Sequence, residues 1–322
     1  MSAPDLLRVV SVSGGKDSTA TLLLALETNW NDDVRAVFAD TGNEHEITLA
    51  YVAQLSDYLE AETGRRIETV RADFTDAMAK KREKLRRIAA GTPESEIYGK
   101  RQFEHAWTPE RAARAAELMQ PTGNVFLDLC LLKGGFPSRK RQYCTENLKG
   151  EPVDRWLAQF LVECRVEQWH GVRADESAHR ATQPDYVWGP RVSIRRPILR
   201  WGVERVFEQH RRHGVKPNPL YSLGCARVGC MPCINASKAD ILNIASRFPE
   251  EIEKVREYEF LMTACARSGG YQVATFFHTR DIGGRGIDDA VSWARTSRGG
   301  KQYDLVAEAE AEMCSSLYGL CE

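Results

Sequence analysis

The chain has 322 residues, with 44 Lys+Arg, 45 Asp+Glu and a formal net charge of −1. This length favours one α/β core with an insertion or a smaller second domain, and the near-neutral charge excludes a uniformly basic surface for nucleic acid or membranes, so any basic site must be a local patch. No apolar run approaches the roughly 20 residues that span a bilayer, and the N-terminus lacks a signal-peptide pattern. We therefore expect a cytoplasmic protein.

Strand-like and helix-like segments alternate along the first part of the chain. Apolar runs at 6–12, 34–40 and 67–73 indicate strands, and the stretches 17–28 and 45–62 have helical periodicity. This β-α-β-α-β order predicts a doubly wound parallel sheet of the α/β class, with ligands bound beyond the carboxyl ends of its strands.

The rest of the chain divides into an insertion and a mainly helical C-terminal region. The basic segment AKKREKLRR and a second helical pattern fall within about residues 75–142, which we interpret as an insertion. A helix near 147–163 and a buried strand from residue 166 return the chain to the sheet. We predict an α/β domain over residues 1–215, followed by a Cys-rich loop and helices over 216–322.

The string SVSGGKDS joins the first strand to the first helix. It is not a Walker A loop, because Val10 occupies the first glycine position and Asp17 follows the lysine. Two glycines between a strand and a helix still let backbone N–H groups point at an anion, and the helix N-terminus adds a partial positive charge. Lys16 supplies a full charge, while Ser13 and Ser18 supply hydroxyls. We interpret the string as a phosphate site rather than an ordinary βα turn.

SGGKDS resembles the SGGxDS signature of the PP-loop superfamily, whose members have the adenine-nucleotide α-hydrolase (HUP-type) fold and split ATP between its α and β phosphates. Further segments resemble the phosphoadenosine phosphosulfate (PAPS) reductase-like branch of that superfamily. They are FADTGNEHEIT at 38–48, GVRADESAHR at 171–180, RPILRWGVERVF at 196–207 and NPLYSLGCARVGCMPC at 218–233. All occur in the expected order.

The resemblance implies nucleotide-binding roles in three of these segments. Residues 13–18 would bind the phosphates, residues 40–42 would border the adenosine, and residues 173–180 would close the other side of the site. The implied residues are Ser13, Gly14, Gly15, Lys16, Asp17, Ser18, Asp40, Thr41, Gly42, Arg173, Glu176, Ser177 and Arg180, of which Lys16 and Asp17 are also candidate catalytic residues. Arginines can clamp phosphate or sulfate oxygens through paired N–H groups, and Glu176 can hold an arginine in place.

Cys225, Cys230 and Cys233 form a Cx4CxxC pattern in a loop that contains glycine and proline, so three thiolates can converge on one metal centre. The resemblance implies Cys144 as a further ligand and a 4Fe-4S cluster as the metal group. Family reductases carry a Cys-Cys pair where this chain has Tyr143 before the cysteine, so Cys225 would supply the missing thiolate. With this departure, the cysteine pattern is more similar to that of the PP-loop component of DNA phosphorothioation systems than to that of an assimilatory reductase. Zinc, a 2Fe-2S cluster and unligated buried thiols are the alternatives.

The C-terminal string MCSSLYGLCE contains Cys314 and Cys321. Sulfonucleotide reductases end in a tail, Glu-Cys-Gly-Leu-His, whose cysteine attacks the substrate sulfur; here the order Gly-Leu-Cys-Glu differs. Cys321 is a candidate nucleophile with Cys314 as its resolving thiol, and an unreactive terminal cysteine is the equal alternative. Cys130, Cys164 and Cys265 lie in apolar surroundings and are expected in the core.

The basic residues of the insertion form either a solvated helical face or part of a nucleic-acid groove. Under the second interpretation, side chains near the nucleotide edge would contact phosphates. The candidates are Lys80, Lys81, Arg82, Arg139, Lys140 and Arg141.

Two reactions and one non-catalytic role are compatible with these motifs. The first is ATP-dependent sulfur transfer, in which ATP is split at the α phosphate, Mg²⁺ neutralises the pyrophosphate, and sulfur displaces AMP from a nucleic acid or metabolite. The second is reduction of adenosine phosphosulfate (APS) or PAPS by Cys321, with sulfite released by a thiol reductant. The third is a nucleotide and Fe-S sensor without turnover. SGGKDS favours the first reaction, and the tail cysteines favour the second.

The partners expected from these hypotheses are an adenine nucleotide and a nucleic-acid substrate bound through the basic patch. A thioredoxin-like reductant would serve the reductase, and a cysteine desulfurase would serve the sulfur transferase. We also expect a homo-oligomer, and no membrane partner.

Overall fold

The computed structural model describes residues 6–28, 34–99, 105–267, 274–277 and 286–296. The chain divides into two compact units, and each is described by itself. The first unit comprises residues 1–72, 145–240 and 298–322, and the second comprises residues 73–144 and 241–297. The predicted boundary between residues 215 and 216 stays a prediction.

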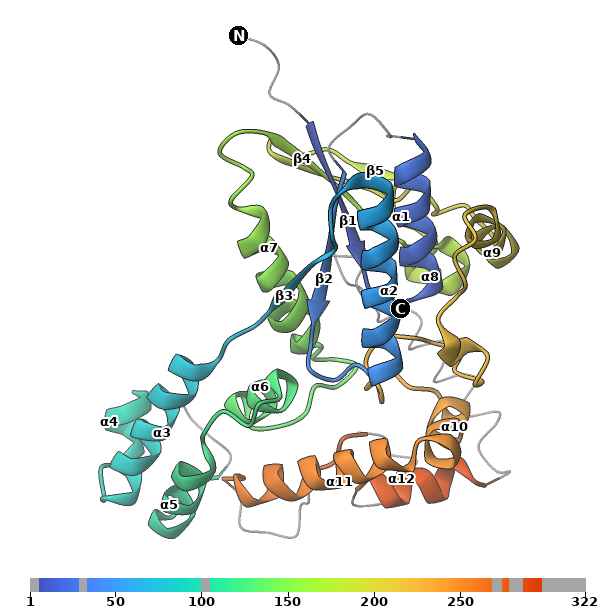
Figure 1. Cartoon of the computed structure of the whole chain (residues 1–322). Coiled ribbons are helices and arrows are strands. Elements are labelled where there is room, and N and C mark those ends of the chain that lie inside the picture. The colour runs from blue at the N-terminus through green and yellow to red at the C-terminus, as the bar shows by residue number, and fades with distance from the viewer. Residues whose placement is uncertain (1–5, 29–33, 100–104, 268–273, 278–285, 297–322) are drawn as a thin grey trace. The chain divides into compact units, whose positions relative to one another are not determined.

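The first unit is built on a six-stranded sheet with the order β3-β2-β1-β4-β6-β5 (Figure 1). Its neighbouring strands are parallel except for the antiparallel pair β5 and β6. The strands are β1 Leu6–Val12, β2 Val34–Asp40, β3 Glu68–Arg71, β4 Arg165–Trp169, β5 Tyr186–Val187 and β6 Val192–Arg195. The doubly wound α/β sheet expected from the sequence is confirmed.

The carboxyl ends of the central strands are aligned by their register. Val10 of β1 pairs with Ala36 of β2 and with Trp169 of β4. The segments that follow these three strands therefore start at the same edge of the sheet, where parallel α/β folds bind their ligands.

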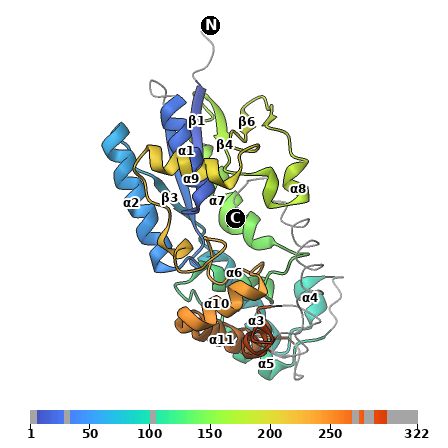
Figure 2. The same ribbon diagram turned by 90° about the vertical axis from the view of Figure 1, so that its right-hand side faces the viewer.

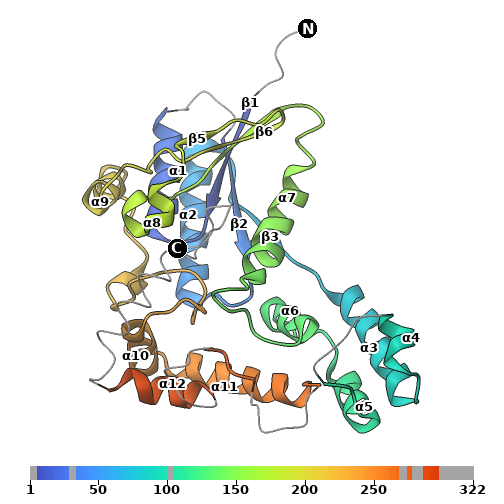
Figure 3. The ribbon, with the colours of Figure 1, turned by 180° about the vertical axis from the view of Figure 1, so that it is seen from behind.

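Helices cover both faces of this sheet. Successive side chains of β1 point to opposite faces, so Val10 and Val12 pack against α1 and α2, while Leu7 and Val9 pack against α7 on the other face (Figure 3). Helix α9 lies beside α1 (Figure 2). The helices of this unit are α1 Lys16–Thr28, α2 Glu46–Thr63, the π-helix Thr145–Gly150, α7 Glu151–Leu157, α8 Ala178–Ala181, α9 Val203–Arg212, and the 3-10 turns Ala174–Glu176 and Pro219–Tyr221.

The second unit is helical. Helix α3 packs against α5 and α6, and α11 packs against α5, α6 and α12. In its core the Phe276 ring lies 5.9 Å from Phe126, 5.3 Å from Phe136 and 5.0 Å from Phe277, centroid to centroid. Its helices are α3 Thr75–Ala89, α4 Glu94–Tyr98, α5 Pro109–Leu118, α6 Val125–Lys133, α11 Pro249–Ala264 and α12 Ile287–Ala294, and α10 Lys238–Arg247 starts in the first unit and ends in the second.

Two local expectations differ from the structure. The helix expected near 147–163 is a π-helix followed by the short α7, because Pro152 has no N–H and fits only the first turn of a helix. Strands β5 and β6 were not predicted; they are only two and four residues long, and Gly189 and Pro190 between them are typical of a turn.

Of the three cysteines expected in the core, Cys130 and Cys265 are buried and Cys164 is half-buried. Burial raises the pKa of Cys265 to about 11, as expected for a structural thiol in apolar surroundings. Among the helices that the structure describes, none is both long and apolar enough to cross a bilayer.

Candidate functional site

Residues 13–18, called the glycine loop below, connect β1 to α1 at the carboxyl edge of the sheet. Gly14 has a φ of +80°, which glycine adopts at little cost. A Cβ atom here would lie 2.8 Å from Thr48 Cγ2 and 3.1 Å from Val52 Cγ2. Neither the backbone conformation nor the space allows a side chain, so this glycine is required by the fold of the loop.

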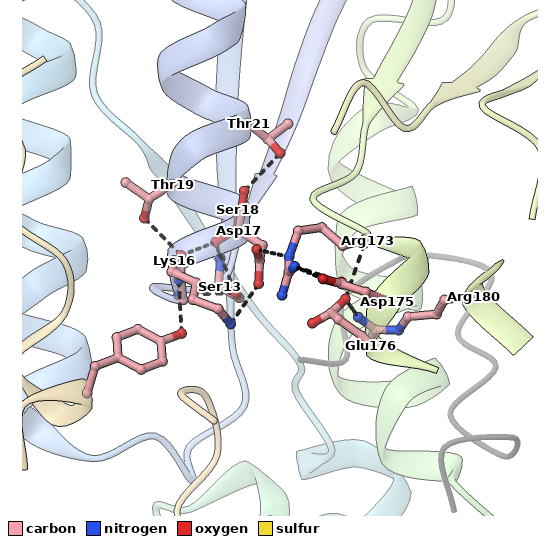
Figure 4. A network of polar contacts seen from close by, with 12 residues as sticks. Ser13, Lys16, Asp17, Ser18, Thr19, Thr21, Arg173, Asp175, Glu176 and Arg180 are labelled. Carbon is pink, nitrogen blue, oxygen red and sulfur yellow. Dashed lines mark hydrogen bonds and ion pairs between the residues drawn. The ribbon is translucent and has the colours of Figure 1, made fainter. Parts of the chain in front are cut away.

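Hydroxyl groups hold the glycine loop in shape. The Ser13 N–H donates to Ser18 Oγ at 3.1 Å, and the Gly15 N–H donates to Ser13 Oγ at 3.3 Å. The hydroxyls of Ser18 and Thr19 donate to Gly15 O at 3.0 Å and 2.9 Å. The two serines predicted to bind phosphate therefore also stabilise the loop itself (Figure 4).

A buried ion-pair network joins the glycine loop to the segment after β4 (Figure 4). The Asp17 side chain is 0% exposed; its Oδ1 lies 2.5 Å from Arg173 Nε, and its Oδ2 lies 2.9 Å from Lys16 Nζ. Arg173 Nη1 lies 2.6 Å from both carboxylate oxygens of Asp175. Burial acts to lower the pKa of Arg173, but Asp17 and the neighbouring carboxylates raise it overall. Lys16 and Arg173 compensate the charge of the Asp17 carboxylate, which would otherwise be costly to bury.

Residues 171–180, called the arginine segment, place a second arginine beside the first. Glu176 accepts the backbone N–H of Arg173 at 3.2 Å and forms an ion pair with Arg180. Ser177 begins α8, its Oγ accepting the Arg180 N–H at 3.1 Å. Arg173 thus links the predicted residues of this segment to Asp17, and Glu176 holds Arg180, as its chemistry suggested.

The arginine segment approaches the glycine loop at Gly171. A Cβ atom on Gly171 would lie 2.7 Å from Ser18 N and 2.8 Å from the Asp17 carbonyl carbon. Both neighbours are backbone atoms, which cannot rotate away. The close approach of the two segments therefore depends on a glycine at this position.

The predicted residues after β2 form a tight turn over residues 40–45, called the DTG turn. Asp40 Oδ1 accepts the Gly42 N–H at 2.8 Å, and Gly42 has a φ of +73°. The Thr41 hydroxyl donates to Glu44 Oε1 at 2.6 Å, and its N–H donates to Glu44 Oε2 at 3.0 Å. Burial raises the pKa of Glu44. Glu44 was not predicted as a site residue, although it stands in the quoted string DTGNEHE.

Residues 225–233, called the cysteine loop, pack on the DTG turn. Glu44 and Cys230 form an antiparallel β-bridge. The Met231 N–H donates to Asn43 O at 2.7 Å, and Asn43 Nδ2 donates to Pro232 O at 3.0 Å. Two segments almost 190 residues apart in the sequence are thereby joined at the same edge of the sheet.

Two thiols of the cysteine loop have hydrogen-bonding partners within the first unit. Cys230 Sγ lies 3.3 Å from Thr41 Oγ1 and donates to Glu44 Oε1 at 3.7 Å, and burial raises its pKa well above the ordinary value. Cys233 Sγ accepts the Asn235 N–H at 3.5 Å. Within the described ranges, no three His, Cys, Asp or Glu side chains gather as metal ligands. The metal centre expected from the spacing of these cysteines stays a prediction.

Two further predicted ligands belong to different units. Cys225, at the start of the cysteine loop, is buried in the first unit, and Cys144 belongs to the second unit. Cys314 and Cys321 lie outside the described residues, so the candidate nucleophile and its resolving thiol stay predictions.

The basic patch belongs to the second unit, and one of its members is engaged inside that unit. Lys81 Nζ donates to Leu131 O at 2.7 Å and to Leu132 O at 2.9 Å, near the carboxyl end of α6. Burial lowers the pKa of Lys81 to about 8. Its ammonium therefore stabilises the carboxyl end of α6 and does not belong to a solvated helical face. Among the other members of the predicted patch, the exposed residues are Lys80, Lys140 and Arg141, and the half-buried ones are Arg82 and Arg139.

The lowered pKa of Lys81 predicts a pH dependence of stability. The folded-state pKa of about 8 lies below the ordinary 10.5, so the unfolded chain binds more protons between these values and stability rises with pH across that window. We expect the urea midpoint to rise between about pH 7 and about pH 10, and Lys81→Met to reduce that rise. The control is Lys80→Met, at an exposed position on the same helix. An identical rise in both variants would contradict the assignment.

A mostly parallel sheet with the glycine loop, the arginine segment and the DTG turn at its carboxyl edge defines a doubly wound α/β protein, the class that binds ligands at that edge. The model of the "Phosphoadenosine phosphosulfate reductase domain" matches residues 8–236, which is more than half of the chain. The chain belongs to this family, a nucleotide-binding family of sulfur metabolism, as its motifs indicated.

Several known proteins are similar to this chain. The "Uncharacterized 37.8 kDa protein in gpa 5'region" of Escherichia phage 186 is 44% identical over 344 aligned residues, covering 99% of this chain and 98% of that protein. The adenosine 5'-phosphosulfate reductase of Streptomyces coelicolor is 36% identical over 98 residues, 30% of this chain and 39% of that enzyme. Among solved structures, the PAPS reductase of Candida auris in a phosphate complex aligns with a TM-score of 0.39 and 15% identity, over 72% of this chain and 84% of that chain.

Proposed function

We propose that the chain is an enzyme that binds an adenine nucleotide at the glycine loop and uses it for sulfur transfer. The observation that carries the proposal is the charge arrangement around this loop: Lys16 begins α1, and Asp17 holds both Lys16 and Arg173. A helix N-terminus with a lysine and nearby arginines is suited to a chain of phosphates.

In the preferred reaction the nucleotide is ATP. An oxygen of a nucleic acid or metabolite attacks the α phosphorus, the bond to the β phosphate breaks, and pyrophosphate leaves. A sulfur nucleophile then displaces AMP from the adenylated acceptor. Mg²⁺ would neutralise the charge of the leaving pyrophosphate.

In this reaction the residues of the chain bind and orient the nucleotide. Lys16 would contact the phosphates, and Ser13 and Ser18 would add hydroxyl donors. Asp17 lies within 2.5 Å of Arg173 Nε and 2.9 Å of Lys16 Nζ, so we assign it the orientation of these two cations rather than proton transfer. In-line positioning of the phosphates would then supply most of the rate enhancement.

The alternative reaction is reduction of APS or PAPS. The thiolate of Cys321 would attack the sulfur of the sulfonucleotide and displace AMP from APS or adenosine 3',5'-bisphosphate from PAPS. A thioredoxin-like dithiol would then release sulfite and become a disulfide. The partial likeness to the reductase of Streptomyces coelicolor favours this alternative. A nucleotide-binding sensor or partner protein without turnover is the candidate of another class.

A metal group at the cysteines is a separate proposal, supported by their spacing. The ligands would be Cys144, Cys225, Cys230 and Cys233, with a 4Fe-4S cluster or zinc as the bound group. Because Cys230 is paired with Glu44 in this structure, no reaction step is assigned to the group. Iron, acid-labile sulfide and zinc contents of anaerobically purified protein test it, and the absence of all three would contradict it.

The proposal extends to partners. A cysteine desulfurase would supply sulfur for the preferred reaction, the exposed basic residues of the second unit would contact a nucleic-acid acceptor, and the chain would act as a homo-oligomer. Co-purification tests the desulfurase, and salt-dependent binding of labelled DNA and tRNA tests the nucleic-acid contact. Light scattering tests the homo-oligomer.

One experiment separates the reactions. Anaerobically purified protein is supplied with APS or PAPS plus thioredoxin and assayed for sulfite, and with ATP, Mg²⁺, and DNA or tRNA and assayed for pyrophosphate. We expect pyrophosphate release that falls about a hundredfold in Lys16→Ala, the order expected for losing one donor to transition-state charge. Lys216→Ala, at an exposed lysine outside the basic patch, is the matched control.

The other outcomes are equally specific. Sulfite release that Cys321→Ser abolishes would establish the reductase and overturn the preferred reaction. Nucleotide binding without either product would support the sensor.

A further inference from the structure

Three side chains from the segment after β6 contact the backbone of the glycine loop. Asn218 Nδ2 donates to Gly14 O at 3.2 Å. Tyr221 Oη accepts the Lys16 N–H at 3.0 Å. His210 on α9 donates from Nε2 to Lys16 O at 2.8 Å, and the donor is defined because a carbonyl oxygen only accepts.

Two of these three side chains are buried inside the first unit, and Tyr221 is half-buried. His210 is 0% exposed and Asn218 is 1% exposed. Burial lowers the pKa of His210, which favours the neutral imidazole. A buried polar group retains its hydrogen bond because breaking it leaves a costly unpaired donor. The contacts of His210 and Asn218 are therefore rigid constraints on the loop.

The constraints set the direction of the loop's N–H groups. In a trans peptide the C=O and the following N–H point in opposite directions. Fixing Gly14 O at Asn218 thus fixes the Gly15 N–H, and fixing Lys16 O at His210 fixes the Asp17 N–H. Both N–H groups lie at or next to the N-terminus of α1, where an anion would bind.

Tyr221 also acts on the lysine side chain. Lys16 Nζ lies 5.3 Å from the centroid of the Tyr221 ring, within the range of a cation–π contact. The same residue therefore holds the backbone of Lys16 through its hydroxyl and the ammonium through its ring. The ammonium is one of the loop's predicted phosphate contacts.

We propose that His210, Asn218 and Tyr221 form a clamp that positions the glycine loop for a chain of phosphates, as in a nucleoside triphosphate or pyrophosphate. They are positioning residues, because they act through the backbone and lysine of the loop. The proposal rests on the nucleotide-binding function proposed above. Preorganised donors lower the ordering cost of binding, so loss of the clamp weakens the phosphate part of recognition.

The test compares ligands with and without phosphates by calorimetry on the full chain. In His210→Leu, which removes the donor, we expect pyrophosphate and ATP to bind about tenfold more weakly and adenosine to stay within about twofold. His210→Gln, whose amide can donate to Lys16 O, restores most of the affinity. Tyr221→Phe weakens pyrophosphate binding in the same way.

The matched control is Tyr58→Phe, because the Tyr58 hydroxyl bonds His213 Nδ1 at 3.1 Å and not the glycine loop. Unchanged pyrophosphate binding in His210→Leu and Tyr221→Phe would overturn the clamp alone. An equal loss of adenosine would overturn it too, since that indicates general disruption. If His210→Leu fails to fold, Tyr221→Phe and His210→Gln carry the comparison. An unaltered chain that binds neither pyrophosphate nor ATP would overturn the proposed function as well.

Discussion

Replacing Arg173 with methionine is expected to lower the free energy of unfolding by about 3 kcal/mol and to abolish nucleotide binding. Asp17 is 0% exposed and lies 2.5 Å from Arg173 Nε. Without the guanidinium, the buried carboxylate keeps Lys16 alone as a cationic neighbour among the described residues. Breaking a buried pair leaves a charge that the interior does not solvate. Urea unfolding and ATP calorimetry measure the two effects.

The control for this prediction is Arg66→Met. Arg66 forms ion pairs with Asp57 and Glu60, but all three side chains are about half exposed or more. Exposed pairs contribute little to stability, so the urea midpoint should not change measurably. Equal shifts in the two variants would show that the Arg173 network is not the stabilising feature described here.

Replacing Gly171 with valine is expected to lower the free energy of unfolding by about 1–3 kcal/mol and to prevent pyrophosphate binding. Even the first carbon of a side chain would lie 2.7 Å from Ser18 N. The glycine loop must then move away from the arginine segment. Thermal unfolding and calorimetry with pyrophosphate provide the readouts.

Gly135→Val is the matched control, because a Cβ on Gly135 meets no heavy atom within 4 Å. It should leave pyrophosphate binding intact. Retention of full binding in Gly171→Val would mean that the loop tolerates the displacement, and the required close approach would be refuted.

Local sequence patterns predicted the parts of the fold that depend on neighbouring residues. Strands β1 and β2 have the predicted bounds, because each is an apolar run ended by a turn. The glycine loop was also predicted, since its glycines, lysine and serines lie within six consecutive residues. Such features need no knowledge of distant contacts.

The contacts that complete the site depend on distant residues, and no local pattern indicates them. His210 reaches Lys16 across 194 positions of the sequence, and it stands in a polar helix where a histidine has no distinctive spacing. Asn218 and Tyr221 lie in the quoted string NPLY, but their roles follow only from the carbonyl and N–H groups that they meet. The Glu44 and Cys230 pair is likewise a product of folding.

The short connection between Tyr221 and Cys225 limits where any sulfur chemistry at that cysteine can take place. Four residues of fully extended chain span at most about 14 Å, and the Cys225 N–H is already bonded to Leu220 O at 3.0 Å. The Cys225 thiol therefore stays close to Tyr221, the residue that contacts Lys16. Under the proposed function, any chemistry at Cys225 would take place beside the glycine loop, and a sulfur acceptor would have to reach that edge of the sheet.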